Sequence, residues 1–184
     1  MRRRRRGCAF GPILWIFIIL AALWGIKWGM ATYFPMPYGD MASEAAADYD
    51  VDKALLYAVM KAESNFDEGA LSPKGARGLM QMMPETAKWC GEKTGIENPD
   101  LLNPRESIRV GAYYLAYLIN RYEGDERVAV AAYNAGHGRV DSWLSDKAVS
   151  PDGKTLSAIP YPETEKYVKK VMLFRKIYEK RLAP

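Results

Sequence analysis

Hydrophobic and polar residues divide this chain into an apolar N-terminal segment and a longer segment of mixed pattern. Residues 8–26 form a run of 19 residues without a charge. As a helix, this run would be about 28 Å long, which is close to the ~30 Å hydrocarbon core of a bilayer. Five arginines at positions 2–6 precede the run, and Lys27 and Trp28 follow it, as is typical of residues at the two membrane interfaces. The pattern predicts a transmembrane anchor within residues 1–30.

The orientation of the anchor follows from its charges. An arginine cluster stays on the cytoplasmic side, so residues 1–30 are predicted to form a cytoplasmic basic tip and a single span of the cell membrane. The rest of the chain then lies on the extracytoplasmic side. A cleaved signal peptide begins in the same way and is the alternative. We favour the anchor, because the apolar run is long and leads into Trp28, Tyr33 and Phe34 instead of a small-residue cleavage site.

The remaining residues show the three-to-four residue spacing of helices. Residues 31–42 contain Pro35, Pro37 and Gly39 and are predicted to be a linker to a domain over residues 43–184. Residues 66–78 and most of residues 138–157 are predicted to be irregular, and no segment alternates like a strand. The fold class is therefore all-α. The predicted helices cover residues 53–63 after a capping Asp50 or Asp52, 84–93 from Pro84 to Gly95, 104–122 from Pro104, 128–133 between Asp125 and Gly136, and 163–181.

Composition and charge exclude several classes of function. The formal charge is +4, but six of the 26 basic residues lie in the first 30 residues, which leaves 20 basic against 22 acidic residues afterwards. No basic surface for a nucleic-acid partner is therefore expected. The two cysteines, Cys8 and Cys90, are not expected to pair, and Cys8 stands at the start of the apolar run, whereas a lipoprotein cysteine follows such a run. One histidine, His137, and no closely spaced cysteines give no metal site.

Glu63 is the best candidate for chemistry from the residues alone. It follows Leu56 and Met60 by seven and three positions, so on a helix it shares their core-facing side. A carboxyl placed there loses hydration, which raises its pKa toward the value that a general acid needs near neutral pH. A surface glutamate at a helix end is the alternative. His137, in a turn flanked by glycines, is interpreted as a solvated loop residue.

Four motifs add a family resemblance. They are Glu63-Ser64, then SPKGARGLMQ at residues 72–81 with Met83-Pro84, then AYNAG at residues 132–136, and IPYPETEKYV at residues 159–168. In this order they resemble the successive signatures of the soluble-lytic-transglycosylase family, over about residues 49–171. The resemblance implies a lysozyme-like helical fold, related to goose-type lysozyme, behind the transmembrane helix.

The resemblance also implies roles for individual residues. Glu63 matches the family's catalytic glutamate. Glu163 matches a glutamate that either serves the site or starts a helix, whereas Glu165 stands where many relatives carry arginine, which leaves any contact of that arginine in doubt. No metal or organic cofactor is implied. The positions that match substrate-binding residues are Ser64, Ser72, Gln81, Met83, Tyr133, Asn134 and Tyr167.

The function that the resemblance implies is cleavage of peptidoglycan glycan strands without water. Glu63 would protonate the oxygen between N-acetylmuramic acid and N-acetylglucosamine, and a 1,6-anhydro ring would close on the muramic acid. Two alternatives stay open. One is a goose-lysozyme-like muramidase, which needs a second carboxylate such as Asp67 or Glu68. The other is a non-catalytic glycan-binding or scaffold module of a cell-envelope machine. No feature of the sequence specifies a protein partner.

Overall fold

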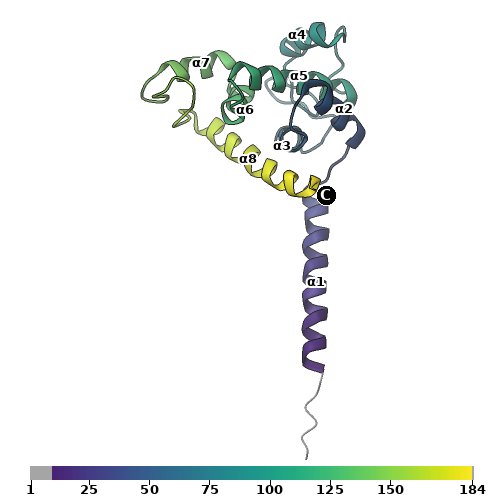
Figure 1. Cartoon of the computed structure of the whole chain (residues 1–184). Coiled ribbons are helices and arrows are strands. Elements are labelled where there is room, and N and C mark those ends of the chain that lie inside the picture. The colour runs from purple at the N-terminus through teal and green to yellow at the C-terminus, as the bar shows by residue number, and fades with distance from the viewer. Residues whose placement is uncertain (1–9, 184) are drawn as a thin grey trace, which may run out of the picture. The chain divides into compact units, whose positions relative to one another are not determined.

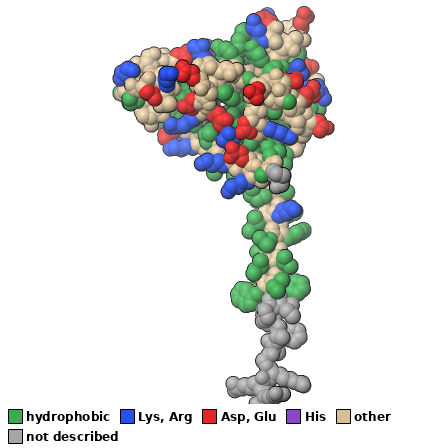
Figure 2. Space-filling model, viewed as in Figure 1, with side chains coloured by type: hydrophobic (Ala, Val, Ile, Leu, Met, Phe, Trp, Pro, Cys, Tyr) green, Lys and Arg blue, Asp and Glu red, His purple; other side chains and the backbone are tan. Residues whose placement is uncertain are grey.

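The computed structural model describes residues 10–183 of the chain, which forms two compact units, Met1–Met36 and Pro37–Pro184. The arginines at positions 2–6 and Cys8 lie outside the described residues. The first unit contains helix α1 (Phe10–Tyr33), whose apolar side chains from Leu14 onward are exposed (Figure 2). At ~1.5 Å per residue, its 24 residues extend about 36 Å. Among the described residues it is the one helix long and apolar enough to cross a membrane, a test that a signal sequence also passes.

The second unit is built from helices, and the described residues contain no strand, only isolated bridges that pair Arg77 with Leu71 and with Met82. The predicted all-α fold class is therefore confirmed. The helices are α2 (Gly39–Tyr49), α3 (Lys53–Glu63), α4 (Pro84–Thr94), α5 (Pro104–Arg121), α6 (Glu126–Ala135), α7 (His137–Ser145) and α8 (Pro162–Leu182) (Figure 1).

Helix α3 lies at the centre of this unit. Asp52 caps its first turn by accepting a hydrogen bond from the Ala54 amide at 2.7 Å. Every residue from Ala54 to Met60 is buried, so this short helix has no face left for solvent along most of its length. Helix α8 packs against it, and Tyr57 of α3 stacks on Tyr178 of α8 with ring centroids 5.4 Å apart. The position of Glu63 is thus fixed by a helix that is buried along most of its length.

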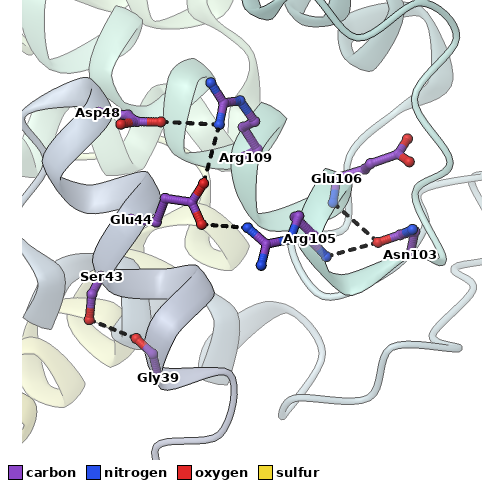
Figure 3. Close-up of polar contacts among 8 residues, drawn as sticks. All are labelled: Gly39, Ser43, Glu44, Asp48, Asn103, Arg105, Glu106 and Arg109. Atoms are coloured by element: carbon purple, nitrogen blue, oxygen red, sulfur yellow. Dashed lines mark hydrogen bonds and ion pairs between the residues drawn. The ribbon is translucent and has the colours of Figure 1, made fainter.

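Helix α5 forms a second centre of packing, in contact with α2, α4 and α6. Its first turns bind α2 through charges (Figure 3). Arg105 pairs with Glu44, and Arg109 lies 3.1 Å from Asp48 and 3.8 Å from Glu44. Such partly exposed pairs contribute little each, about 0–1 kcal/mol, but they fix the register between the two helices.

Arg175 of α8 connects the helices that carry the candidate site. Its guanidinium lies 2.7 Å from Asp52, the cap of α3, and 3.0 Å from Glu126 in the first turn of α6. A third carboxylate, Glu179, lies 3.0 Å away on α8 itself. Because one side chain binds α3 and α6 together, the relative positions of these helices depend on α8.

Two helices and one boundary differ from the sequence-based expectation. Helix α2 was not predicted, and α1 and α2 extend into the expected linker over residues 31–42, so the connection between them is residues 34–38. The irregular assignment of residues 138–157 is wrong for its first part, which forms α7. Helix α7 buries Val140 and Trp143, three positions apart, and this packing stabilises a helix that begins with a histidine and a glycine.

Candidate active site

The candidate site is centred on Glu63, the last residue of α3. The hydroxyl of Tyr167 on α8 donates a hydrogen bond to Glu63 Oε1 at 2.5 Å, across 104 positions of sequence. Burial raises the pKa of Glu63 to about 7, against the opposing effects of the Tyr167 hydrogen bond and of the positive charge on Lys170. A carboxyl with this pKa carries its proton in a large share of molecules near neutral pH, which is the state required of a general acid.

Lys170 lies one helical turn after Tyr167 and faces the same end of α3. Its Nζ donates to the carbonyl oxygen of Ala62 at 2.9 Å, next to Glu63. A cation at the C-terminal end of a helix is favoured by the helix dipole and satisfies a carbonyl that has no partner within the helix. Lys170 therefore caps α3 and also lowers the pKa of Glu63, although burial outweighs it.

Tyr133 of α6 completes the surroundings of the carboxyl. Its hydroxyl donates to the carbonyl oxygen of Met80 at 2.9 Å and lies 3.2 Å from the sulfur of Met82. Burial raises the pKa of Tyr133 well above its usual range, and the negative charge of Glu63 raises it further, so the two groups are close. Burial and Glu63 act on the pKa of Tyr167 in the same direction. Both phenols are consequently neutral and able to donate hydrogen bonds.

Asn134, the next residue of α6, has its amide oriented by α8. The hydroxyl of Thr164 donates to Asn134 Oδ1 at 2.9 Å, and Thr164 is buried whereas Asn134 is exposed. With its oxygen occupied, the Asn134 side chain presents its NH₂ group outward as a donor. A neutral acceptor on a substrate, such as an amide carbonyl, is the matching chemistry.

Three residues expected to bind substrate make backbone hydrogen bonds in the segment between α3 and α4. Ser64 Oγ donates to the Leu79 carbonyl at 2.9 Å, and Ser72 Oγ accepts from the Ala76 amide at 2.9 Å. Gln81 Nε2 donates to the carbonyls of Ala70 and Gly78, each at 3.0 Å. These side chains hold the segment in shape, and their contact with substrate stays a prediction.

The shape of this segment also depends on one glycine. Gly78 adopts a φ of +72°, and a Cβ added there would lie 1.7 Å from the backbone oxygen of Leu101. Only glycine fits this conformation and this close approach. The turn at Gly78 leads directly into Leu79, Met80 and Gln81, which contact Ser64, Tyr133 and the start of the segment.

The other predicted positions lie around the edge of the site. Met83 precedes α4 and is 40% exposed, while its neighbour Met82 is buried against Tyr133. Glu163 lies in the exposed first turn of α8, where a carboxylate is favoured by the helix dipole. Glu165 pairs with Lys169 at 2.6 Å along the same helix. The described residues, 10–183, contain no group of three or more His, Cys, Asp or Glu side chains that could hold a metal ion.

Sequence reasoning missed Thr164, Lys170 and the two buried methionines beside Tyr133. Thr164 and Lys170 lie three residues before and after Tyr167, and this spacing places all three side chains on one face of a helix. That spacing was a usable signal. The sequence contains no comparable signal for Met80 and Met82, because their contacts with Tyr133 span more than fifty positions. Together the described groups surround one buried carboxyl of raised pKa on an all-α scaffold.

Comparison with known proteins shows which protein family this chain belongs to. The family model of the transglycosylase SLT domain matches residues 40–155, and the chain therefore belongs to this family. It is 34% identical over 178 residues to the soluble lytic murein transglycosylase of Salmonella typhimurium, a match that covers 92% of this chain and 27% of that protein. It is also 34% identical over 172 residues to the membrane-bound lytic murein transglycosylase C of Edwardsiella ictaluri, which covers 78% of this chain and 46% of that protein.

The same family is found among solved structures. The lytic transglycosylase Slt of Pseudomonas aeruginosa, determined as an inactive mutant, superposes with a TM-score of 0.74 at 35% identity. That match covers 83% of this chain and 25% of the larger protein. The chain thus spans about a quarter of the length of the soluble transglycosylases and about half that of the membrane-bound one, and the SLT domain lies within the matched part.

Proposed function

We propose that this chain is a peptidoglycan lytic transglycosylase in which Glu63 is the single catalytic acid and base. The observation that carries the proposal is the Glu63 carboxyl itself, whose pKa burial raises to about 7 and whose position is fixed by the hydrogen bond from the Tyr167 hydroxyl. Membership of the SLT family supports the activity, since the relatives at 34% identity are named lytic murein transglycosylases.

The reaction begins with proton transfer. Glu63 donates its proton to the oxygen between N-acetylmuramic acid and N-acetylglucosamine, and the bond from that oxygen to the anomeric carbon breaks. The N-acetylglucosamine leaves with a hydroxyl group. Positive charge at the anomeric carbon is met by the carbonyl oxygen of the sugar's own N-acetyl group. A second protein carboxylate, as used by most glycosidases, is then not required.

The reaction ends with ring closure. The C6 hydroxyl of the same muramic acid attacks the anomeric carbon and gives its proton to the Glu63 carboxylate, which restores the acid. The product is a 1,6-anhydro sugar, and no water is consumed. A tethered nucleophile can reach an effective concentration of ~10⁵ M or more, so ring closure outcompetes water when the geometry is right.

The neighbours of Glu63 have assignable parts in this scheme. Tyr167 keeps the carboxyl in place through its hydrogen bond, and Tyr133 and the outward NH₂ group of Asn134 orient the N-acetyl group. Ser64, Ser72 and Gln81 act through the backbone that they hold.

A muramidase that uses water would need a second carboxylate near the anomeric carbon. Glycosidases place their two carboxyls about 5–5.5 Å apart when they retain configuration and about 6.5–9.5 Å apart when the second carboxylate activates water directly. Among the described residues, the groups that shift the pKa of Glu63 are Tyr167 and Lys170, and neither is a carboxylate. Asp67 and Glu68, the nearest acidic residues in sequence, are exposed. This arrangement favours ring closure over hydrolysis.

The test is the chemistry of the product. Purified full-length protein should be incubated with sacculi, and the released fragments reduced with borohydride and weighed by mass spectrometry. Ring closure leaves no reducing end, so the muramic ends should be lighter than reduced hydrolytic ends by one water and one H₂. Glu63→Gln keeps the size of the side chain and should lower the rate by at least about a hundredfold.

Other outcomes would assign the chain differently. Mostly reducible muramic ends would make it a muramidase. An active Glu63→Gln protein, within about tenfold of wild type, would remove Glu63 from the mechanism. Absence of turnover by the wild-type chain would favour a glycan-binding module.

Membrane attachment is a second part of the proposal. We propose that α1 remains uncleaved and holds the domain on the extracytoplasmic side of the cell membrane. The length and apolar surface of α1 support attachment, as does the similarity to a membrane-bound relative. The assignment of the domain to the extracytoplasmic side is based on the arginines at positions 2–6.

A further inference from the structure

Helix α8 differs in charge from the rest of the second unit. It contains seven of the 20 basic residues that follow residue 30, but only three of the 22 acidic residues. The second unit without α8 is therefore acidic, whereas α8 carries a net positive charge. Figure 2 shows Lys and Arg side chains along the edge of this unit that α8 forms in Figure 1.

Most of this positive charge lies on one face of the helix. The opposite face of α8 is buried through Thr164, Val168, Val171 and Tyr178, so the charged face points away from the core. Five lysines recur on it at intervals of three or four positions, the spacing that repeats along one side of an α-helix. Leu173, which is 57% exposed, lies among them. Together with Leu173, these lysines form the α8 basic face: Lys166, Lys169, Lys170, Lys176 and Lys180.

Contacts within the protein leave most of this charge uncompensated. Lys169 pairs with Glu165 at 2.6 Å, whereas Lys170 donates to the carbonyl oxygen of Ala62, which carries no net charge. Within residues 10–183, no ion pair is formed by Lys166, Lys176 or Lys180. The α8 basic face is therefore able to bind an external anion without breaking an internal ion pair of these three lysines.

The C-terminal end of α8 lies where the second unit is joined to α1. Tyr178 of α8 stacks on Tyr57, and the Tyr57 hydroxyl donates to the carbonyl oxygen of Pro37, the first residue of the unit, at 3.2 Å. Only residues 34–36 separate Pro37 from the end of α1 at Tyr33, and fully extended this connection spans at most about 14 Å. The lysines on either side of Tyr178 are thus tethered close to the end of the apolar helix.

We propose that the α8 basic face docks on the anionic phospholipid headgroups of the membrane that α1 spans. The inference rests on the membrane attachment proposed above, and it adds that the domain itself binds the membrane surface. From Lys166 to Lys180 the face extends about 21 Å along the helix, which suits a planar array of phosphate groups better than one small anion. The lysines bind the phosphates, and Leu173 reaches between the headgroups.

Docking also has a consequence for the candidate active site. Tyr167, which donates its hydrogen bond to Glu63, lies on the same helix, between Lys166 and Lys170. A docked α8 therefore holds the Glu63 site close to the membrane surface. The proposed cleavage is then directed at glycan strands near the membrane.

Quenching by lipid measures docking in the full-length chain. A fluorophore is attached at Leu173→Cys in a chain that also carries Cys8→Ser, because Cys90 is buried and protected from the label. The protein is placed in lipid nanodiscs that contain a nitroxide-headgroup lipid, which quenches the fluorophore on contact. Quenching should be strong when the discs contain phosphatidylglycerol and weak in phosphatidylcholine alone. It should also decrease as salt is added, because ions screen charges at the surface.

Removing charge from the α8 basic face should reverse docking. The triple variant Lys166→Gln, Lys176→Gln and Lys180→Gln should lower the ratio of docked to undocked molecules about a hundredfold, from about fivefold for each lysine. The three side chains are exposed and form no ion pair, so the unfolding temperature should not change. The matched control removes three exposed lysines outside α8 and should change the ratio by less than about twofold. It consists of Lys74→Gln, Lys88→Gln and Lys93→Gln.

Several results would overturn the proposal. Equal quenching in discs with and without phosphatidylglycerol would show that headgroup charge is not recognised, and this arm needs no lysine variant. An equal loss of docking in the two triple variants would show that only net charge matters. If the α8 triple variant still docks but binds acidic wall polymer in sacculi less tightly, the lysines bind the wall and not the lipid.

This inference and the proposed function can fail separately. If the chain releases anhydro products and keeps its anchor but does not dock in the discs, only the α8 inference is wrong. If the intact chain docks but has no turnover, the proposed activity is wrong and the lipid-binding face stands. If the mature protein begins after residue 30 although the intact chain docks, the uncleaved anchor is wrong.

Discussion

At the scale of single residues, the pKa of Glu63 is raised by one influence and lowered by two others. Burial favours its neutral form, whereas the Tyr167 hydrogen bond and the charge of Lys170 favour the carboxylate. Burial is the largest effect, which is why the pKa rises to about 7 and does not fall. The site therefore contains a carboxyl that can both lose and regain a proton near neutral pH.

The pH dependence of cleavage follows from this balance. In the proposed mechanism Glu63 starts protonated, so kcat/KM should fall as pH rises through about 7. Lys170→Met removes a charge that lowers the Glu63 pKa, and the fall should therefore move to higher pH. Lys169→Met, which removes the partner of Glu165, is the matched control and should leave the profile in place. A profile that Lys170→Met leaves unchanged or moves to lower pH would contradict the assignment.

The same carboxyl should lower the stability of the folded protein at alkaline pH. Its pKa is higher in the folded state, about 7, than the ordinary value of 4.5, so stability falls as pH rises across this interval. Glu63→Gln removes the loss of stability that comes from ionising this carboxyl in the folded state. The variant should be more stable than wild type near pH 8, by at most about 3 kcal/mol, and no more stable near pH 4.

Urea unfolding at the two pH values measures this difference. Glu92→Gln, an exposed substitution on α4, should give no such pH-dependent gain. An equal stability difference for Glu63→Gln at both pH values would show that the carboxyl does not titrate in this interval.

At the scale of secondary-structure elements, the contact between α6 and α8 decides how Asn134 is presented. The buried Thr164 hydroxyl holds the Asn134 oxygen at 2.9 Å, so the outward group is the NH₂ donor. Thr164→Val has the same shape without the hydroxyl and should lower kcat about tenfold, because the amide can then rotate. Thr164→Ser keeps the hydroxyl and should restore most of the rate.

A structural role alone would give a different result. Thr164→Val would then lower the unfolding temperature, and at a temperature where it is fully folded its kcat would equal that of wild type. Steady-state kinetics well below the unfolding temperature, with circular dichroism on the same samples, separates the two possibilities.

Much of the helical pattern could be predicted from the sequence because strong local signals mark its ends. Pro84 and Pro104 begin α4 and α5, and Asp52 and Asp125 cap α3 and α6, as expected. The helices without such signals were missed. Helix α2 is rich in alanine and has no side-chain cap, and α7 is held by tertiary packing of Val140 and Trp143.

The site shows the same division between local and long-range information. Glu63 could be singled out by its spacing from Leu56 and Met60, and Tyr133 and Tyr167 by their motifs. Their hydrogen-bond partners could not be predicted. The carbonyl of Met80 receives the Tyr133 hydroxyl, and the hydroxyls of Ser64 and Ser72 turn out to hold backbone, because such contacts depend on the folded path of the chain.

At the scale of the whole molecule, the two units have different surroundings under the proposed function. Helix α1 exposes apolar side chains along its length, which water does not favour, while the second unit buries its apolar side chains in a core of its own. Protease added outside intact, wall-stripped cells should therefore digest the domain over residues 43–184 and spare a small membrane-embedded fragment. A cytoplasmic control protein should survive the treatment.

N-terminal sequencing of the mature protein completes this test. An intact start is expected for an anchor. A mature chain that begins after residue 30 would show a cleaved signal peptide and a released enzyme, and full protection from protease would place the domain on the cytoplasmic side.

Under the proposed function, the hydrogen bond between Glu63 and Tyr167 also limits how early during synthesis the protein can become active. Its two partners are 104 positions apart, and a ribosome adds residues one by one at about 5–20 per second. For several seconds of synthesis the acid therefore exists without the helix that orients it. In the proposed topology the N-terminus stays in the cytoplasm and the domain crosses the membrane after α1, so that α8 is the last helix to cross. Under the proposed function, the chain would therefore be unable to cut the wall until its delivery is almost complete.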